Sequence, residues 1–281
     1  MQGSYFKFFI SILSLFFVFN SSHANIPKES CVPGGVALVP LMAGKHQSKP
    51  IVDLKGQPVA VIPNPDKASA HDWLAVVGIP LLDTPKTLWL KVDNQILNYE
   101  KPIPIEAKNY PTEKLKFKVG TQKGPSPELV ARLEKETAEM ENAFESWHPK
   151  EVATFKLKRP VKVGRISGLY GARRMINGEM KRPHRGLDFA APIGTPVLAA
   201  ATGKVILVAN HLLTGKTVML DHGQGFKTVY CHLHNVKVKQ GAQLKAGQAL
   251  GTVGKTGRAT GPHLHFGVSL NNERVSPELF L

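Results

Sequence analysis

The sequence predicts a mainly β protein, with two antiparallel β-domains joined by one helix. Short alternating apolar runs, separated by Pro, Asp, Asn and Gly, fill the chain from residue 36 to about residue 119. Such runs are typical of small antiparallel β-domains. One segment with helical periodicity follows. From Phe155 onward β-type runs return between closely spaced glycines, which predicts a second, mostly antiparallel β-domain with very little helix.

Residues 1–24 have the plan of a secretory signal peptide. Lys7 precedes twelve mostly apolar residues, and Ser22 and Ala24 stand where signal peptidase reads small side chains. An uncleaved anchor is the alternative, but this run is short against the roughly 20 residues of a spanning helix. We therefore expect cleavage after Ala24, export, and no stable membrane span in the mature protein.

The first β-domain is expected over residues 25–119. Its apolar runs at 36–39, 73–77 and 88–92 are short and bounded by turn residues, which favours an antiparallel arrangement such as a sandwich. It contains no catalytic cluster. Substrate recognition, partner binding and inhibition by folding over the site are the alternatives for its role.

Residues 120–150 are predicted to form a linker and a helix. Ser126 can cap the helix, Pro127 suits its first turn, and Pro149 ends it. An apolar stripe recurs at three-to-four-residue steps, at Leu129, Leu133, Met140, Phe144 and Trp147. We expect this stripe to pack on a domain rather than to bind a partner.

The second β-domain, residues 151–281, holds three polar motifs. The first two lie at residues 184–188 and 263–265. On an extended strand His184 and Asp188 would point to one side and could flank a metal, with Gly186 leaving room between them. His263 and His265 would likewise share a face. Each pair alone has a simpler interpretation. His184 and Asp188 could share this spacing by chance, and His263 and His265 could be two solvated histidines at the edge of a sheet. Buried imidazoles, however, need partners, and a metal is one.

The third motif is Tyr230, His232 and His234, which would share a face of a strand. By itself it would be read as containing a core histidine. Taken together, the three motifs offer two histidines and a carboxylate as ligands, with spare histidines beside them. Three N and O ligands and an open fourth position are typical of a catalytic zinc site.

In this order the motifs resemble those of the lysostaphin-type zinc endopeptidases, the LytM family. The resemblance covers roughly residues 160–281 and is specific in residue type, order and spacing. It is carried by the segments 164–167, 170–173, 183–189, 221–225, 230–233 and 254–266. It implies a peptidase domain built on an antiparallel β-sheet.

The resemblance also implies the roles of five residues. His184, Asp188 and His265 would hold one zinc ion per chain, and His232 and His263 would be catalytic. Zinc would acidify a bound water and polarise the scissile carbonyl. His263 would handle the proton of the water while His232 steadies the oxyanion, or the two roles are exchanged. No His-Glu-x-x-His motif is present to supply a glutamate base.

Four further residues near these motifs have open interpretations. Asn177 could touch substrate or cap the zinc in a latent form, and Tyr230 could line the cleft or only pack. His222 is expected to be a hydrogen-bonded turn residue, and His234 to be exposed.

The charge and the cysteines constrain the partners. The formal net charge is +15, and +14 once Lys7 leaves with the signal, which favours an anionic polymer as neighbour. The chain has no nucleic-acid-binding signature, so we expect peptidoglycan and no nucleic acid. Cys31 and Cys231 could pair in an oxidising compartment, or Cys231 could be a small buried hydrophobe.

The expected function is an exported zinc endopeptidase that cuts peptide crosslinks of peptidoglycan, with a D,D-crosslink as the expected bond. Localisation in the periplasm of a Gram-negative cell is expected from the signal without a wall-anchoring motif. A non-catalytic regulator of wall amidases is the alternative, but such family members have lost ligands and all five positions are filled here. A passive wall- or lipopolysaccharide-binding protein would explain the charge but not the motifs. The oligomeric state is left open.

Overall fold

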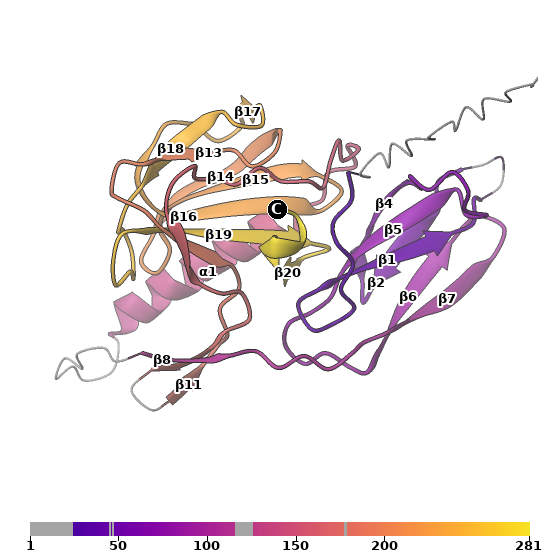
Figure 1. The fold of residues 1–281 in the computed structure, drawn as a ribbon, viewed down its shortest axis with the longest axis horizontal. Helices are drawn as coiled ribbons and strands as arrows, with labels where there is room; N and C mark the ends of the chain where they lie inside the picture. The colour runs from indigo at the N-terminus through magenta and orange to yellow at the C-terminus, as the bar shows by residue number, and fades with distance from the viewer. Residues whose placement is uncertain (1–24, 45, 47, 116–125, 177–178) are drawn as a thin grey trace, which may run out of the picture.

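The computed structural model describes residues 25–44, 46, 48–115, 126–176 and 179–281. Within them one α-helix separates two β-rich parts along the chain (Figure 1). This composition confirms the predicted mainly β class. The expected signal peptide, residues 1–24, lies outside the described residues. No described helix combines the length and apolar character that crossing a membrane requires.

Two sheets packed face to face form the N-terminal sandwich, in the orders β1-β5-β4 and β3-β2-β6-β7. Alternate residues point between the sheets, so Ala37, Ala75, Val52 and Leu90 share one buried cluster. The strands are β1 (Val36–Leu41), β2 (Ile51–Leu54), β3 (Gln57–Pro58), β4 (Ala60–Pro63), β5 (Trp73–Gly78), β6 (Thr87–Asp93) and β7 (Asn98–Pro104).

The other part is built on a ten-stranded sheet, called here the C-terminal sheet, with the central order β17-β14-β15-β16-β19-β12-β9. Its pairings are all antiparallel. Its strands are β9 (Arg165–Gly168), β12 (Leu187–Ala190), β13 (Pro196–Leu198), β14 (Gly203–His211), β15 (Gly215–Gly223), β16 (Phe226–Val236), β17 (Gln243–Leu244), β18 (Ala249–Val253), β19 (His263–Leu270) and β20 (Glu273–Val275), followed by the short 3-10 helix η2 (Pro277–Leu279).

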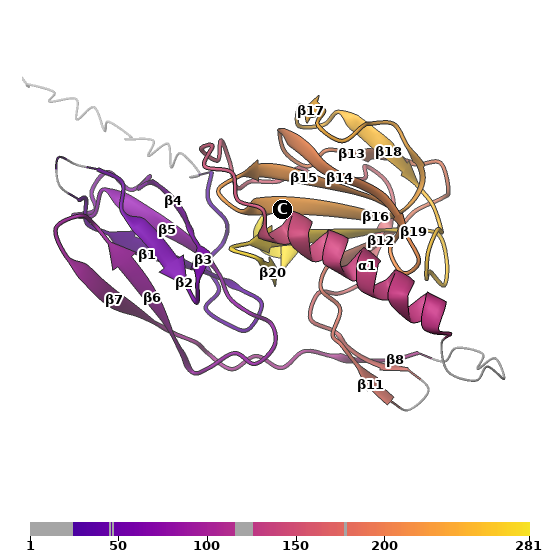
Figure 2. The ribbon, with the colours of Figure 1, turned by 180° about the vertical axis from the view of Figure 1, so that it is seen from behind.

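A small three-stranded sheet connects the segment after the sandwich to the C-terminal part. The strand β8 (Thr112–Leu115) runs parallel to β10 (Arg173–Ile176), and β10 pairs with β11 (Glu179–Lys181). The parallel pair is the exception to the antiparallel arrangement that the sequence predicts. It brings the end of the N-terminal part alongside the segment that leads into β12 (Figures 1 and 2).

The N-terminal sandwich docks on one end of the C-terminal sheet. Val36 and Val76, on the outer face of the β1-β5-β4 sheet, join the core cluster of the C-terminal sheet. Asn271, in the β19–β20 turn, receives the N–H of Gly78 at 2.6 Å and donates to its carbonyl at 3.0 Å. Gln224, in the β15–β16 turn, accepts the N–H of Val61 at 3.1 Å. These turns lie at the end of β19 that is opposite to His263.

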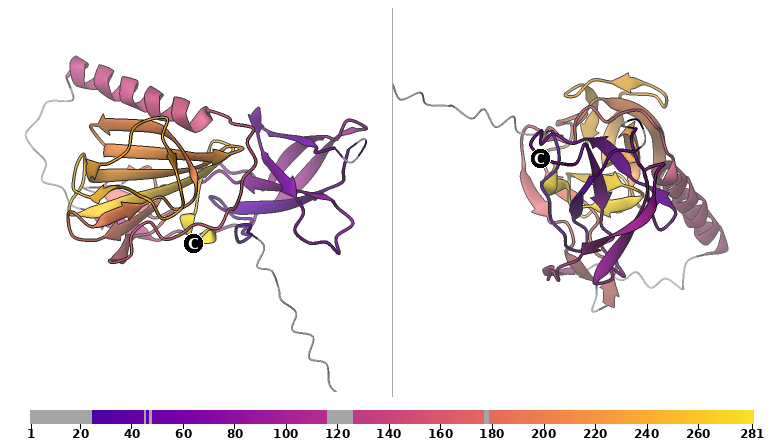
Figure 3. Two further views of the ribbon diagram at one scale, coloured as in Figure 1. Left: turned by 90° about the horizontal axis from the view of Figure 1, so that it is seen from above. Right: turned by 90° about the vertical axis from the view of Figure 1, so that its right-hand side faces the viewer.

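The helix α1 (Pro127–Glu145) begins and packs as the sequence predicts. The hydroxyl of Ser126 accepts the N–H of Leu129, and Pro127 occupies the first turn. Met140 and Phe144 pack on one face of the C-terminal sheet, together with Ala143, and Figure 3 shows the helix lying along that face. Trp147, the last residue of the predicted stripe, lies beyond the end of the helix.

A buried polar network crosses the other face of the sheet. Tyr230, fully buried, accepts the N–H of Ala200 at 2.8 Å, and its hydroxyl lies 3.0 Å from Oγ1 of Thr228. That Oγ1 lies 2.9 Å from Nε2 of His222, whose Nδ1 lies 2.9 Å from the carbonyl of Thr202. Burial lowers the pKa of His222 to about 4, despite this carbonyl and the nearby charge of Asp221.

This network predicts that His222 makes stability fall in acid. The unfolded histidine takes up a proton below its ordinary pKa near 6.5, whereas the folded one stays neutral until about pH 4. The free energy of unfolding should therefore drop by about 3 kcal/mol between pH 6.5 and 4. Urea unfolding of protein freed of metal by a chelator should show that the free energy of unfolding of His222→Gln falls less between pH 6.5 and 4 than that of the unaltered protein. His234→Gln is the control, because His234 is exposed. An equal loss of unfolding free energy in the unaltered protein, His222→Gln and His234→Gln would contradict the role of His222.

Candidate active site

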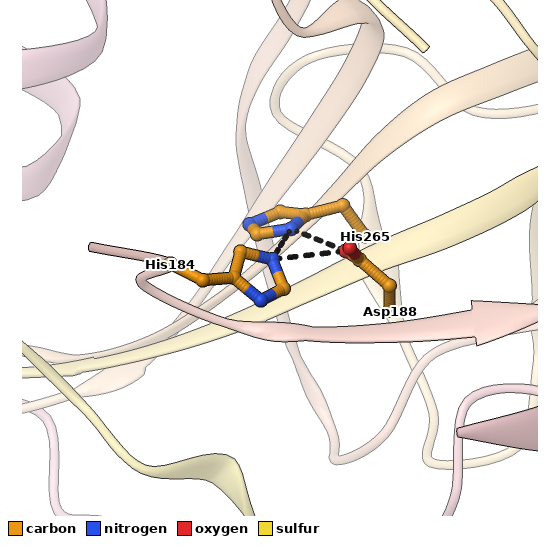
Figure 4. A group of neighbouring side chains, drawn as sticks. All are labelled: His184, Asp188 and His265. Carbon is orange, nitrogen blue, oxygen red and sulfur yellow. Dashed lines mark hydrogen bonds and ion pairs between the residues drawn. The ribbon is translucent and has the colours of Figure 1, made fainter. Parts of the chain in front are cut away.

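Three potential metal ligands converge on the C-terminal sheet (Figure 4). Nδ1 of His265 lies 2.9 Å from Nε2 of His184 and 2.9 Å from Oδ1 of Asp188, and Nε2 of His184 lies 3.0 Å from the same oxygen. They form a group of one carboxylate and two imidazoles that could hold a metal ion. The predicted ligand residues therefore do come together.

Different elements place these three side chains. Asp188 on β12 and His265 on β19 are direct cross-strand partners, so both project from one face, called here the site face. His184 lies before β12 rather than on it, so the predicted extended alternation from 184 to 188 is wrong. Its Nδ1 lies 2.9 Å from the carbonyl of Leu169. This contact assigns the proton to Nδ1 and leaves the lone pair of Nε2 facing the other two ligands.

The electrostatics of this group suit a cation. Burial by itself would raise the pKa of Asp188, but the close contacts with His184 and His265 hold it well below its usual range. The carboxylate is thus ionised: Nδ1 of His265 can donate to its Oδ1, and Nε2 of His184 lies 3.0 Å from the same oxygen. A tetrahedral zinc ion with bonds of about 2.1 Å needs donor atoms about 3.4 Å apart. The triangle would need to open by only about 0.5 Å, so the residues fit the ion.

His232 and His263 stand beside this triangle with their Nδ1 atoms already engaged. Nδ1 of His232 lies 2.8 Å from the carbonyl of Thr256, and Nδ1 of His263 lies 2.8 Å from that of Gly261. The two rings are 4.7 Å apart between centroids. Nε2 of His263 is 3.9 Å from Oδ1 of Asp188. Donation through Nδ1 leaves each Nε2 free to accept a proton.

Burial, together with the neighbouring His263 and His265, lowers the pKa of His232 to about 4, against the carbonyl of Thr256 and the charge of Asp188. The ring is therefore neutral at pH 7. A neutral imidazole has one nitrogen that donates and one that accepts, and the contact with Thr256 decides which is which.

A β-bulge puts His232 on the site face. The register of β16 against β15 shifts around Thr217, and His232 has a left-handed φ of 61°. Tyr230 therefore packs against Phe266 on the opposite face, with ring centroids 5.4 Å apart. The predicted sharing of a face by Tyr230 and His232 is wrong, because strict alternation does not survive the bulge.

The remaining site predictions have mixed outcomes. Tyr230 is fully buried with a bonded hydroxyl, so it packs and does not line a cleft. Asn177 lies outside the described residues. His234 is exposed, as expected. Cys31 and Cys231 are free thiols, and Cys231 is buried under α1.

Comparisons with known proteins agree with this arrangement. Residues 182–277 match Peptidase family M23, and residues 29–108 match the Peptidase family M23 N-terminal domain. A crystal structure from Pseudomonas aeruginosa, described as an M23 peptidase, is 40% identical and has a TM-score of 0.74. The alignment covers 90% of this chain and 95% of that one. The chain belongs to peptidase family M23. The predicted metallopeptidase class is thereby confirmed at the level of the family.

Curated relatives match this M23 chain over part of its length. Two are the peptidoglycan DD-endopeptidases ShyB and ShyA of Vibrio cholerae, 47% identical over 93 residues and 42% identical over 114 residues. These matches cover 33% and 40% of this chain, and 22% and 26% of the relatives. The chain thus spans about a quarter of the length of these relatives.

Some residues that shape the M23 site carry no sequence signal. The carbonyls of Leu169 and Thr256 orient two histidines, and any residue type could supply a carbonyl. The need for glycine at position 168 appears only in the structure, because a Cβ there would lie 2.5 Å from Oδ2 of Asp188. The glycine in the middle of the 184–188 motif was the better signal. A Cβ at Gly186 would lie 2.6 Å from Cε1 of His265 and 2.6 Å from the carbonyl of Phe266.

Gly186→Ala should therefore displace the ring of His265. The neighbouring carbonyl belongs to the sheet and cannot move aside, so the ring must shift, at a cost of about 1–3 kcal/mol. We expect zinc affinity to fall at least about tenfold, measured by competition with a chelator. Gly261→Ala is the matched control, because a Cβ there meets nothing within 4 Å. Equal zinc affinity in both variants would refute this role of Gly186.

Proposed function

We propose that this M23 chain is a zinc-dependent endopeptidase that hydrolyses peptide crosslinks of bacterial peptidoglycan. The observation that carries the proposal is the convergence of His184, Asp188 and His265, with two further histidines facing the same point. Three protein ligands leave a coordination position open, as in catalytic rather than structural zinc sites. The zinc stoichiometry of one per chain belongs to the proposal.

The roles of the residues follow from their positions. Zinc in this site supplies Lewis acidity, which lowers the pKa of a water ligand and polarises a carbonyl. His263 accepts or orients a proton through Nε2, since its Nδ1 is committed to the carbonyl of Gly261. His232, held by Thr256, would steady the oxygen that gains charge once its Nε2 has taken up a proton. The two histidines can exchange these roles.

The substrate class is supported by relatives and by charge. Both Vibrio cholerae relatives are peptidoglycan DD-endopeptidases, so a D,D-crosslink is the proposed bond. The net charge of +15 suits an anionic wall polymer. Export by the segment 1–24, with cleavage after Ala24, and a periplasmic location complete the proposal.

The division of the chain also remains a proposal: residues 25–119 as an N-terminal β-domain, 120–150 as linker and helix, and 151–281 as the peptidase domain. The sandwich docks at the end of the sheet away from His263. The helix α1, which lies between the two domains along the chain, packs on the site face through Met140 and Phe144. Any influence of residues 25–119 on the site would thus act through α1 or β8.

Digestion of purified peptidoglycan by the full chain tests the proposed function. We expect release of uncrosslinked peptides, identified by mass, that stops with a chelator and returns with zinc. Absence of cleavage by protein shown to contain zinc would refute the enzyme and favour a non-catalytic regulator of wall amidases. Cleavage of another bond would refute the D,D assignment alone.

A further inference from the structure

A cavity opens on the site face of the C-terminal sheet, between α1 and the sheet. Its volume is about 180 Å³. Arg185, which directly follows His184, lines it together with Arg274 of β20. Thr214 also lines it, and the carbonyl of Thr214 accepts the N–H of His232. The cavity is therefore flanked by neighbours of both a proposed ligand and a proposed catalytic residue.

Arg274 is held in place with part of its hydrogen-bonding capacity unused. Its guanidinium carbon lies 3.7 Å from the centroid of the Phe144 ring. Its Nη1 donates to the carbonyl and to Oδ1 of Asn272. A guanidinium carries five N–H donors in a planar fork, so a further acceptor can be bound without moving the group.

Neither arginine of the cavity is directly paired with a carboxylate in the part of the chain that the structure describes. Among the described residues, neither Arg185 nor Arg274 forms an ion pair within 4.0 Å. Glu136 is already engaged, by Arg132 at 2.7 Å and by the N–H of Leu212 at 2.7 Å. Glu141 lines the cavity, and Glu273 and Glu145 also act on Arg274, but none of the three forms an ion pair with it within 4.0 Å.

The charge of Arg185 disfavours that of Arg274. Burial, followed by the proximity of Arg185, lowers the pKa of Arg274 to about 10. Two like charges held in a partly desolvated space are a cost that a bound anion relieves. A carboxylate suits the planar fork of a guanidinium better than a spherical ion does. Met140, Phe144 and Leu213 add apolar wall for the carbon atoms next to such a group.

We propose that Arg185 and Arg274 form a subsite for a free carboxylate of the substrate peptide, beside the proposed zinc site. The inference rests on the proposed function, because crosslinked wall peptides carry free carboxylates at side chains and chain ends. The subsite would select acidic stem peptides over their amidated forms and would fix the side from which the peptide enters.

Binding, measured without turnover, tests this subsite. The probes are a wall stem tetrapeptide and derivatives of it in which each carboxylate is amidated in turn. Titration calorimetry with the zinc-loaded full chain should show that one amide binds about tenfold to a hundredfold more weakly than the acid. Arg185→Gln and Arg274→Gln should bind the acid as weakly as that amide, and should bind the amide as the unaltered protein does.

Arg182→Gln is the matched control, since it removes an exposed positive charge three residues from Arg185 that does not line the cavity. It should keep the preference for the acid. If Arg274→Gln fails to fold, Arg274→Lys keeps the charge and should retain a reduced preference. A preference that survives in both glutamine variants, or is missing from the unaltered protein, overturns the subsite. Failure to cleave peptidoglycan while this preference holds would refute the proposed reaction and leave the subsite standing.

Discussion

His265→Ala is expected to lose zinc and peptidase activity together. Nδ1 of His265 contacts both other ligands of the triangle, at 2.9 Å to Nε2 of His184 and 2.9 Å to Oδ1 of Asp188. Its removal leaves two ligands, one of them an ionised carboxylate that has lost its hydrogen bond from His265. Loss of a mere hydrogen-bond partner of a ligand costs ten- to a hundredfold in metal affinity or activity. Loss of the ligand itself should cost at least about a thousandfold.

Zinc content by mass spectrometry and hydrolysis of purified peptidoglycan measure the two effects separately. His234→Ala is the control, because His234 is an exposed histidine on the neighbouring strand β16. It should keep both properties. Full zinc occupancy in His265→Ala would show that the ligand set is wrong, whatever happens to activity.

His263→Ala is expected to keep zinc and lose turnover. His263 lies outside the triangle, with its Nε2 still 3.9 Å from Oδ1 of Asp188 and its Nδ1 held by Gly261. Removing a group that handles a proton typically costs about a hundredfold to ten-thousandfold in rate. Because no ligand is lost, zinc affinity should change little. The loss should appear in kcat rather than in KM.

The double variant with His232→Ala sharpens this test. Residues that act as one catalytic unit are not additive, so the second substitution should cost much less than it does alone. The His263→Ala chain should also still protect zinc from a chelator. Loss of the metal from this variant would move His263 into the ligand set and refute the division between ligands and catalytic histidines.

The sequence alone determined the elements whose signals are local. Short alternating runs marked the β class, and Ser126 and Pro127 marked the start of α1, because caps and side-chain alternation act within a few residues. The polar motifs offered two histidines and a carboxylate as ligands, and the family resemblance singled out the three residues of the triangle, although His184 reaches it from outside the strand that the alternation predicted.

The tertiary structure decided which face each site residue occupies. His232 and Tyr230 are separated by a bulge, and that bulge depends on how β16 pairs with β15, far along the chain. Arg185 and Arg274 meet in one cavity through sheet pairing and the packing of α1. Strand register and cross-sheet packing arise from contacts between distant segments, and no local pattern contains them.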